Sequence, residues 1–326
     1  MIDNCGREIN YMRISVTDRC NLRCRFCMPE GGFKFLNEEE ILNFEELKRI
    51  IRAAVPLGIN HFRITGGEPL VRPGITEFIS EVKKMDGVKT VTMTTNGVLL
   101  GEKALGLVKA QIDTINVSLT SLDPLEYGFV TGKNKIDQVL EGIHKLMEYG
   151  IHTKINCVPL ININEDNIEK LAAIAKKDKI DVRFIEMMPI GKGASFGAIS
   201  NETIRSRLEE KYGAAISSIN IKGNGPAVYY KFPDFVGNIG FISAKSHEFC
   251  NKCNRVRLTA DGYLKLCLNY NYGINIKEAV RTEVSIEELS EIIRKEILKK
   301  PKHHNFNEKN NTGYDENTRF MAQIGG

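Results

Sequence analysis

The 326-residue sequence lacks three features that would assign a chain to a broad class of protein. Its N-terminus, Met1-Ile2-Asp3-Asn4-Cys5, has no basic segment followed by an apolar one, so we expect no secretory signal peptide. No apolar run approaches the roughly 20 residues of a membrane-spanning helix. The formal net charge of +4 is too small to argue for nucleic acid, although it would tolerate an anionic ligand.

Eight cysteines in a chain without a signal peptide indicate a reducing compartment, so the sequence predicts a cytoplasmic protein. In such a compartment, clustered cysteines indicate metal or catalytic sites rather than disulfides. Apolar residues make up 42% of the chain and charged residues 26%, as in ordinary globular proteins. The length allows one large domain or two.

Strand and helix patterns alternate along the first two thirds of the sequence. Such alternation predicts a parallel sheet, either doubly wound or curled into a barrel, and periodicity alone does not separate the two. Asn43 and Glu46 form an expected capping box at the first helix. The strands are expected at residues 10–17, 61–65, 88–94, 112–119, 152–159 and 180–187, and the helices near residues 43–54, 75–85, 102–110, 135–149, 165–177 and 201–212.

Beyond Tyr212 the alternation of strand and helix patterns ends. Residues 214–242 contain Gly, Pro and short apolar runs without helical periodicity, which favours β-structure or loop. A helix is expected within residues 279–300, and residues 303–318, rich in Asn, His and Glu, are expected to be flexible. We therefore expect two domains, residues 1–213 and residues 214–326.

Three cysteines within eight residues, Cys20, Cys24 and Cys27, have the spacing C-x3-C-x2-C. Thiolates are soft ligands that suit zinc, copper(I) and iron–sulfur clusters. A structural zinc site would need a fourth ligand, usually from a second C-x2-C arm. A 4Fe–4S cube held by three cysteines instead leaves one iron open to a small ligand. A zinc loop or buried core cysteines are the alternatives, but core cysteines do not cluster in a polar, Arg-rich loop.

A second set of three cysteines lies in the C-terminal third and consists of Cys250, Cys253 and Cys267. A zinc ribbon would require a fourth cysteine. With His247 as the fourth ligand, a Cys3His zinc site remains the alternative. Cys5 and Cys157 are further candidates, although Cys157 lies in an expected strand and is expected to pack in the core.

Polar residues follow several expected strands, where barrels of this kind collect their functional groups. Thr65-Gly66-Gly67-Glu68-Pro69 follows the second strand; its glycines would let the backbone approach a ligand, and Glu68 could receive an ammonium group. Thr94-Thr95-Asn96-Gly97 and Asn116-Val117-Ser118-Leu119 end the third and fourth strands and suit ribose or base recognition. Each segment alone could equally be a plain turn.

Cationic residues interrupt the apolar runs of four strands: Arg13, Arg63, Lys154 and Arg183. A lone charged strand residue usually points to solvent. Four together favour an inward-facing cationic set, and such side chains are the natural partners of phosphate. Arg255 and Arg257 lie two residues apart, so on a strand they face the same way and can bind phosphate together.

The segment Met12-Arg13-Ile14-Ser15-Val16-Thr17-Asp18-Arg19, the following C-x3-C-x2-C spacing and Met28-Pro29 resemble the radical S-adenosylmethionine (SAM) enzymes. Together with the GGEP segment, the string Phe249–Leu258 with the later Cys267, and the terminal Gly325-Gly326, they resemble the GTP 3′,8-cyclase family along nearly the whole chain. The resemblance implies a partial (β/α)6 radical SAM barrel with a C-terminal α+β extension. Two departures are Phe26, where many relatives have Tyr, and Thr120, where many have Asp.

The resemblance also implies site residues and cofactors, namely SAM and two 4Fe–4S clusters. The first cluster would be held by Cys20, Cys24 and Cys27, and the second by Cys250, Cys253 and Cys267. SAM would contact Phe26, Gly66, Gly67, Glu68, Ser118 and Met188. GTP would contact Arg13, Arg63, Thr94, Lys154, Arg183, Arg255 and Arg257. Catalytic roles would fall to Arg13, Gly325 and Gly326, with the tail reaching into the active site.

The activity implied is that of a lyase in the first step of molybdenum cofactor biosynthesis. A SAM-derived 5′-deoxyadenosyl radical would abstract the ribose 3′ hydrogen of GTP, and the C3′ radical would add to guanine C8, giving (8S)-3′,8-cyclo-7,8-dihydroguanosine 5′-triphosphate. The second cluster would hold the guanine.

The implied partners are an electron donor and a downstream cyclic pyranopterin monophosphate synthase. We expect a monomer or homodimer, with neither nucleic acid nor membrane as a partner. Two alternatives remain. One is a radical SAM peptide maturase with an auxiliary cluster, which usually has more C-terminal cysteines. The other is an iron–sulfur scaffold or electron carrier, which would need no open iron.

Overall fold

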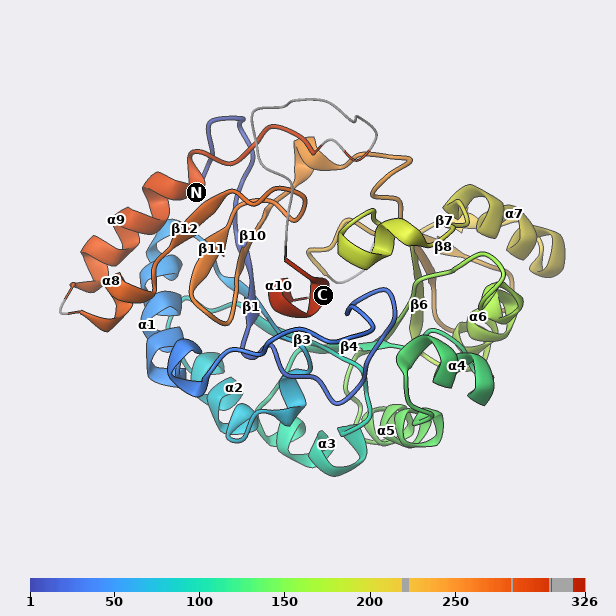
Figure 1. Cartoon of the computed structure of the whole chain (residues 1–326). Coiled ribbons are helices and arrows are strands. Elements are labelled where there is room, and N and C mark those ends of the chain that lie inside the picture. The colour runs from blue at the N-terminus through green and yellow to red at the C-terminus, as the bar shows by residue number, and fades with distance from the viewer. Residues whose placement is uncertain (219–222, 283, 305, 307–318, 326) are drawn as a thin grey trace.

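The computed structural model describes residues 1–218, 223–282, 284–304, 306 and 319–325, and its strands form one continuous sheet (Figure 1). The strand order is β12-β11-β10-β1-β2-β3-β4-β5-β6-β9-β8-β7. Neighbours from β10 to β9 in this order pair in parallel, while the outer pairs are antiparallel. Within the described residues the two end strands are not hydrogen-bonded to each other, so the curled sheet is an open barrel.

The six strands expected from the sequence begin and end within two residues of the expected positions. They are β1 (Tyr11–Ser15), β2 (His61–Thr65), β3 (Thr90–Thr95), β4 (Thr114–Ser118), β5 (Thr153–Cys157) and β6 (Asp181–Ile185). The remaining strands are β7 (Ile216–Ser217), β8 (Val228–Lys231), β9 (Ile239–Ile242), β10 (Arg255–Leu258), β11 (Tyr263–Lys265) and β12 (Gly273–Asn275).

Helices cover the outside of the barrel, with α1 to α6 following the curve of the sheet (Figure 1). The helices of the described residues are α1 (Phe44–Ala54), α2 (Ile75–Lys83), α3 (Leu100–Lys109), α4 (Pro124–Thr131), α5 (Ile136–Glu148), α6 (Ile168–Lys177), α7 (Asn201–Tyr212), α8 (Lys277–Arg281), α9 (Ile286–Ile297) and α10 (Met321–Ile324), of which α10 is not on the outside. The α/β fold expected from the sequence is confirmed.

The alternation within strands separates a core face from a functional face. In β3, Val91 and Met93 are fully buried in the core beneath the helices, while Thr92 and Thr94 lie on the opposite face. The capping box of α1 is also present: Asn43 Oδ1 accepts from Glu46 N at 2.9 Å, and Glu46 Oε2 accepts from Asn43 N at 2.7 Å. Local sequence signals therefore specify both the strands and the start of this helix.

Two features of the fold were not expected. Helix α4 begins at Pro124, and the Asp123 carboxylate caps it by accepting from Leu125 N at 2.9 Å and Glu126 N at 3.0 Å. In addition, β9 and β10 extend the parallel sheet at its two sides, beside β6 and β1. The sheet is therefore continuous across residue 213, and the division into domains at that residue remains a prediction.

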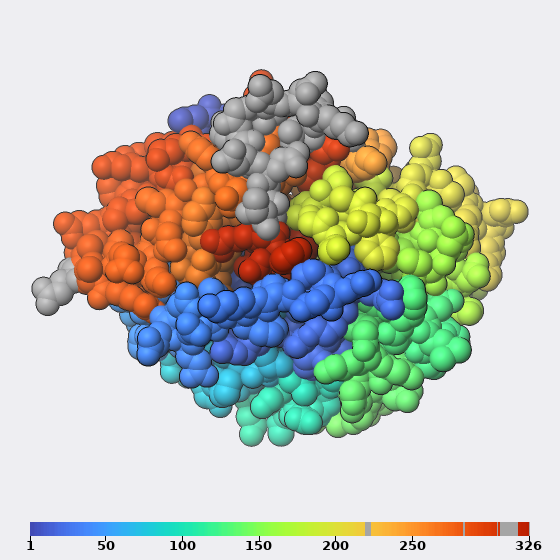
Figure 2. All heavy atoms as spheres, in the orientation of Figure 1, coloured from blue at the N-terminus to red at the C-terminus, as the bar shows by residue number. Residues whose placement is uncertain are grey.

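The last described segment lies at one end of the barrel interior. Helix α10 lies at the centre of the view, bordered by the segment between β1 and α1, residues 16–43 (Figures 1 and 2). Its Ala322 and Ile324 are buried, and the ring of Phe320 stacks on Phe33 at 6.0 Å. Residues 305 and 307–318, most of the segment expected to be flexible, lie outside the described residues. No described helix has both the length and the apolar character needed to cross a bilayer.

Candidate active site

The loop of the first three cysteines is positioned by the glycines of the GGEP segment. Gly67 N donates to Thr17 O at 2.7 Å, and Glu68 N donates to Arg19 O at 2.8 Å. A Cβ atom on Gly67 would lie 2.3 Å from Arg19 O, and one on Gly66 would lie 2.6 Å from Thr17 O. Only glycine fits such a close approach of two backbones. The two glycines therefore let their backbone pack directly against the start of the cysteine loop. Sequence reasoning did not assign this role to them.

Replacing Gly67 with alanine should displace the cysteine loop, because the added carbon meets backbone atoms that have no rotamer to change. We expect the reconstituted Gly67→Ala protein to lose the first cluster and to retain the second. Iron analysis should then give about four irons per chain instead of about eight.

The matched control is Gly101→Ala in α3. A Cβ atom there would meet nothing closer than Glu141 Oε1 at 3.4 Å, and alanine favours a helix by about 0.5–1 kcal/mol over glycine. Gly101→Ala should keep all its iron and melt no earlier than the parent protein. Full iron content in Gly67→Ala would contradict the role of Gly67.

Glu68 is buried and links three segments. Its Oε1 accepts from Thr95 Oγ1 at 2.6 Å and from Leu70 N at 3.1 Å, and its Oε2 accepts from Asn96 N at 2.7 Å. Burial raises the pKa of Glu68 to about 7, even though these hydrogen bonds lower it. A carboxylate has about four acceptor positions. With three used within the protein, one remains for a ligand.

The first three thiols lie in a loop that α4 supports from outside. Arg23 N donates to Thr131 O at 2.8 Å, and Arg25 N donates to Val130 O at 2.9 Å. Burial, and secondarily Cys20, raise the pKa of Cys27 to about 12, while burial and the neighbouring thiols raise the pKa of Cys24 well above its usual range. Only a bound cation would stabilise all three as thiolates, so this donor set fits a metal cluster.

One thiol of the second set, Cys253, lies among cations. Cys250 belongs to a short 3-10 turn, Cys250–Lys252, whose Cys250 O accepts from Arg7 Nη1 at 3.1 Å. Burial raises the pKa of Cys250 to about 11. Burial would also raise the pKa of Cys253, but Lys300 and Arg255 lower it overall. The cations favour the thiolate of Cys253, whereas Cys250 would need a bound metal cluster to be held as a thiolate, and together the set also fits such a cluster.

One group of potential metal ligands lies close together in the part of the chain that the structure describes: the ligand atoms of Glu248, Cys250 and His304 are within 4.8 Å of one another. His247, the expected fourth zinc ligand, is exposed and contacts Ser246 Oγ at 3.3 Å.

Arginines from three neighbouring strands meet inside the barrel. Arg13 of β1 pairs in register with Arg63 of β2 on one side and with Arg257 of β10 on the other. Burial lowers the pKa of Arg13 well below its usual range, and Arg257, Arg63 and Arg255 lower it further. Burial and Arg255 likewise lower the pKa of Arg257 to about 10. The structure thus brings together the cations expected from the sequence.

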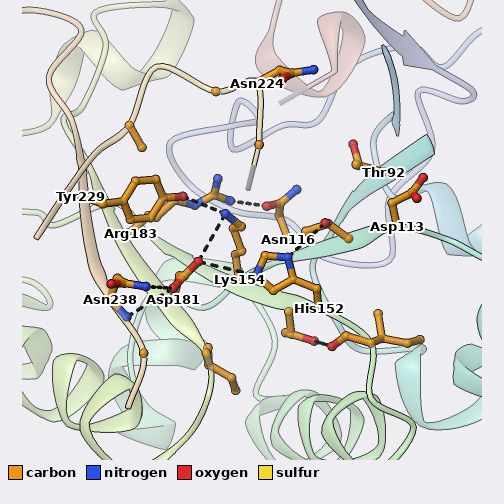
Figure 3. Close-up of a pocket in the computed structure, with 18 of the residues that line it drawn as sticks. Thr92, Asp113, Asn116, His152, Lys154, Asp181, Arg183, Asn224, Tyr229 and Asn238 are labelled. Atoms are coloured by element: carbon orange, nitrogen blue, oxygen red, sulfur yellow. Dashed lines mark hydrogen bonds and ion pairs between the residues drawn. The ribbon is translucent and has the colours of Figure 1, made fainter. Parts of the chain in front are cut away.

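Beside these arginines lies a cavity of about 1010 Å³, whose lining includes Arg63, Lys154 and Arg183 but not Arg13 or Arg257 (Figure 3). It opens toward the N-terminal ends of the strands, because its lining includes their first residues, such as His61, Thr90 and Asp181. Arg183 Nη2 donates to Asn116 Oδ1. Functional side chains were expected at the C-terminal ends of the strands. The cations instead lie mid-strand or nearer the N-terminal ends.

Gly325 is held inside the barrel by Arg257. Gly325 O accepts from Arg257 Nη1 at 2.6 Å, and Gly325 has a φ of 76°. A Cβ atom on Gly325 would lie 2.6 Å from Thr65 Cγ2. Gly326 lies outside the described residues.

The remaining predicted residues lie where their strands end or inside the barrel. Phe26 is half-buried in the cysteine loop, Ser118 ends β4, and Met188 lies in the loop after β6. Thr94 Oγ1 is buried without a hydrogen-bond partner among the described residues, which leaves it available to a ligand. Cys157 is fully buried in β5, as expected, and Cys5 is exposed.

Sequence reasoning missed two residues of the cavity that contact Lys154. Tyr229 of β8 accepts from Lys154 Nζ at 3.1 Å, and Asp181 of β6 lies 3.3 Å from the same nitrogen. Asp181 is two residues before Arg183 and so shares its face of the strand. This spacing is visible in the sequence and could have identified Asp181. Tyr229 belongs to a segment without periodicity, where no signal singled it out.

Two family models match consecutive parts of the chain. Residues 14–175 match the Radical SAM superfamily, and residues 180–306 match Molybdenum Cofactor Synthesis C. With the open α/β barrel and the three-cysteine loop, the first match defines the class of protein, a radical SAM enzyme. Two curated relatives, each aligned over 100% of both chains, are GTP 3′,8-cyclases from Clostridium perfringens (strain SM101 / Type A), 41% identical, and from Thermodesulfovibrio yellowstonii, 43% identical. The chain belongs to the GTP 3′,8-cyclase family.

A solved structure supports the fold. Streptococcus suis SuiB bound to S-adenosylmethionine aligns with a TM-score of 0.61 and 17% identity, over 85% of this chain and 64% of that one. At this identity the likeness concerns the fold alone. The cofactors follow from the family instead: radical SAM enzymes use a 4Fe–4S cluster and SAM, and GTP 3′,8-cyclases carry a second cluster.

Proposed function

We propose that this chain performs the reaction of its family, the cyclisation of GTP between ribose C3′ and guanine C8. One observation carries the proposal: the buried arginines lie between the two cysteine sets. Strand β1, which holds Arg13, ends five residues before Cys20, and β10, which holds Arg257, starts two residues after Cys253. Buried like charges destabilise one another, and a triphosphate would offset that cost.

Cys20, Cys24 and Cys27 would hold the first cluster, and Cys250, Cys253 and Cys267 the second. When bound, the clusters and SAM supply the one-electron chemistry that removes the ribose 3′ hydrogen. The chain's own contribution is to bind, orient and exclude water. Glu68 has one acceptor position left for the SAM ammonium, and Gly66 and Gly67 keep the cysteine loop against it. Phe26, Ser118 and Met188 would complete the SAM site.

The GTP site would run along the barrel interior. Arg13, Arg63, Arg255, Arg257, Lys154 and Arg183 would bind the triphosphate, and Thr94 would use its unpartnered hydroxyl. Arg257 would also hold Gly325 at the reacting end, where Arg13 and the two terminal glycines are proposed to act in catalysis.

The remaining expectations are proposals of the same kind. They are a cytoplasmic location, an external electron donor, a downstream cyclic pyranopterin monophosphate synthase, and a monomer or homodimer. The division into residues 1–213 and 214–326 agrees with the change in sequence rhythm near Tyr212. The two family matches, which end at residue 175 and begin at residue 180, do not decide its position.

Isotope transfer tests the proposed reaction. The protein, reconstituted and reduced without oxygen, is mixed with SAM and GTP carrying deuterium at C3′. We expect 5′-deoxyadenosine one mass unit heavier, together with a nucleotide that separates from GTP on chromatography. GTP deuterated at C4′ is the control and should give unlabelled 5′-deoxyadenosine. Unlabelled 5′-deoxyadenosine from the C3′ substrate would contradict the proposal.

A further inference from the structure

The buried carboxylate of Asp181 lies inside the proposed phosphate site, where a negative charge is unfavourable. Asp181 Oδ2 is 3.3 Å from Lys154 Nζ, and the two side chains are only 8% and 4% exposed (Figure 3). A carboxylate repels phosphate, so its presence beside a phosphate-binding lysine costs affinity unless it also does something useful there.

Asp181 is itself rigidly held. Its Oδ1 accepts from Asn238 Nδ2 at 2.8 Å and from Asn238 N at 3.2 Å, which leaves Oδ2 to face Lys154 (Figure 3). His152 Nε2 lies 3.6 Å from the same Oδ2. Burial raises the pKa of Asp181, but the nearby His152, the hydrogen bonds from Asn238 and the charge of Lys154 outweigh it, so the pKa lies below its usual range and the group is ionised.

Tyr229 is a second fixed contact of the lysine. Its hydroxyl is 3.1 Å from Lys154 Nζ, and its ring centre is 5.0 Å away. Gly240 makes room for this arrangement, because a Cβ atom there would lie 2.8 Å from the Tyr229 ring and 2.9 Å from Arg183 Cγ. The ammonium group is therefore clamped between a fixed carboxylate and a fixed phenol.

Lys154 is the cation that both groups contact within 3.3 Å. Arg183 has a further partner in Asn116, whose Nδ2 in turn donates to Met93 O at 3.0 Å, although Tyr229 and Asp181 also act on Arg183. An unheld lysine side chain loses rotamer freedom when it is ordered, and that loss opposes binding. Ordering it before the substrate arrives removes that cost from binding.

We propose that Asp181 is a positioning residue for substrate: it fixes the ammonium of Lys154, with Tyr229, in the direction of the triphosphate. This inference rests on the proposed function, because it requires Lys154 to contact the phosphates. It also predicts the direction in which the affinity for the triphosphate changes when Asp181 is neutralised, and that direction distinguishes positioning from a simple charge effect. Removing a negative charge should strengthen triphosphate binding through Coulomb attraction alone, whereas loss of positioning should weaken it.

The test is Asp181→Asn, which keeps the side-chain shape. The Kd of GTP for the anaerobically reconstituted protein should rise about tenfold, as for one weakened charge-assisted contact. Guanosine, which has no phosphate, should bind as it does to the parent protein. In turnover, KM for GTP should rise while kcat changes little. Tyr229→Phe should shift the Kd of GTP in the same direction.

Asp113→Asn is the matched control. Asp113 also lines the cavity, but its carboxylate binds Lys83 at 2.7 Å and Val91 N at 2.6 Å, outside the clamp. We expect unchanged GTP affinity in Asp113→Asn. Iron content and melting temperature should match between the two Asn variants. If Asp181→Asn fails to fold, Tyr229→Phe and the lysine variant below carry the test.

A double-mutant cycle with Lys154→Met separates the inference from the function on which it rests. If Asp181 acts through Lys154, Asp181→Asn should have no further weakening effect in the Lys154→Met protein. Equal or tighter GTP binding in Asp181→Asn, while Lys154→Met binds GTP weakly, would overturn the positioning role alone. GTP affinity unchanged by Lys154→Met would instead overturn the proposed phosphate site.

Discussion

Cys24→Ala should abolish SAM cleavage, whereas Cys253→Ala should retain uncoupled SAM cleavage and lose the nucleotide product. The two cysteines belong to sets on different segments, one in the loop after β1 and the other directly before β10. A cube that loses one of three ligands is no longer held, so each substitution should remove one cluster only.

The surroundings of the two thiols differ. In the first set, burial and the neighbouring Cys27 and Cys20 raise the pKa of Cys24 well above its usual range, so these thiols depend on the bound cluster to be held as thiolates. In the second set, Lys300 and Arg255 overcome the effect of burial and lower the pKa of Cys253. Those cations would remain without the thiolate that they stabilise.

Cys5→Ala is the control, because Cys5 is exposed and belongs to neither set. It should retain both activities and all of its iron. Counting 5′-deoxyadenosine with and without GTP, alongside the nucleotide product, distinguishes the outcomes. Normal product from Cys253→Ala, or SAM cleavage at the parental rate by Cys24→Ala, would refute the separate roles of the sets.

The barrel was predictable because each strand carries its own signal. In β3, threonines alternate with Val91 and Met93, and that period of two fixes which face meets the helices. The cysteine sets were predictable for a similar reason, since their spacing is local. The inward direction of Arg13 and Arg63 followed from their neighbours, which are apolar and must occupy the core.

What could not be predicted depends on contacts between distant segments. The need for glycine at Gly67 arises from Arg19 O, and the clamp on Lys154 joins β5, β6 and β8. Neither contact leaves a periodic pattern in the chain. The cavity also opens toward the N-terminal ends of the strands, and only the folded chain shows this.

Gly325→Ala should reduce GTP cyclisation at least about tenfold while leaving both clusters and uncoupled SAM cleavage in place. Gly325 has a φ of 76°, and the left-handed region costs a residue with a Cβ atom about 1–2 kcal/mol. The added carbon would also lie 2.6 Å from Thr65 Cγ2 and 3.4 Å from Ser15 Cβ. Both strands that carry these contacts lead into the proposed SAM site.

The expected defect is specific because other contacts hold the tail up to this point. Ala322 and Ile324 are buried, and Phe320 stacks on Phe33, so α10 should remain seated when Gly325 changes. What should be lost is the contact from Arg257 Nη1 to Gly325 O, at 2.6 Å, together with the placement of the residue that follows. Deleting Gly325 and Gly326 should have the same effect.

Gly31→Ala is the matched control, since Gly31 lies in a loop where a Cβ atom would meet nothing within 4 Å. It should cyclise GTP at the parental rate. The two roles available to the tail predict different ratios of product to 5′-deoxyadenosine. If the tail only seals the barrel, Gly325→Ala should lower both together. If it acts on the substrate, as proposed, 5′-deoxyadenosine should persist while cyclised product falls, and an unchanged ratio would exclude a role at the reacting end.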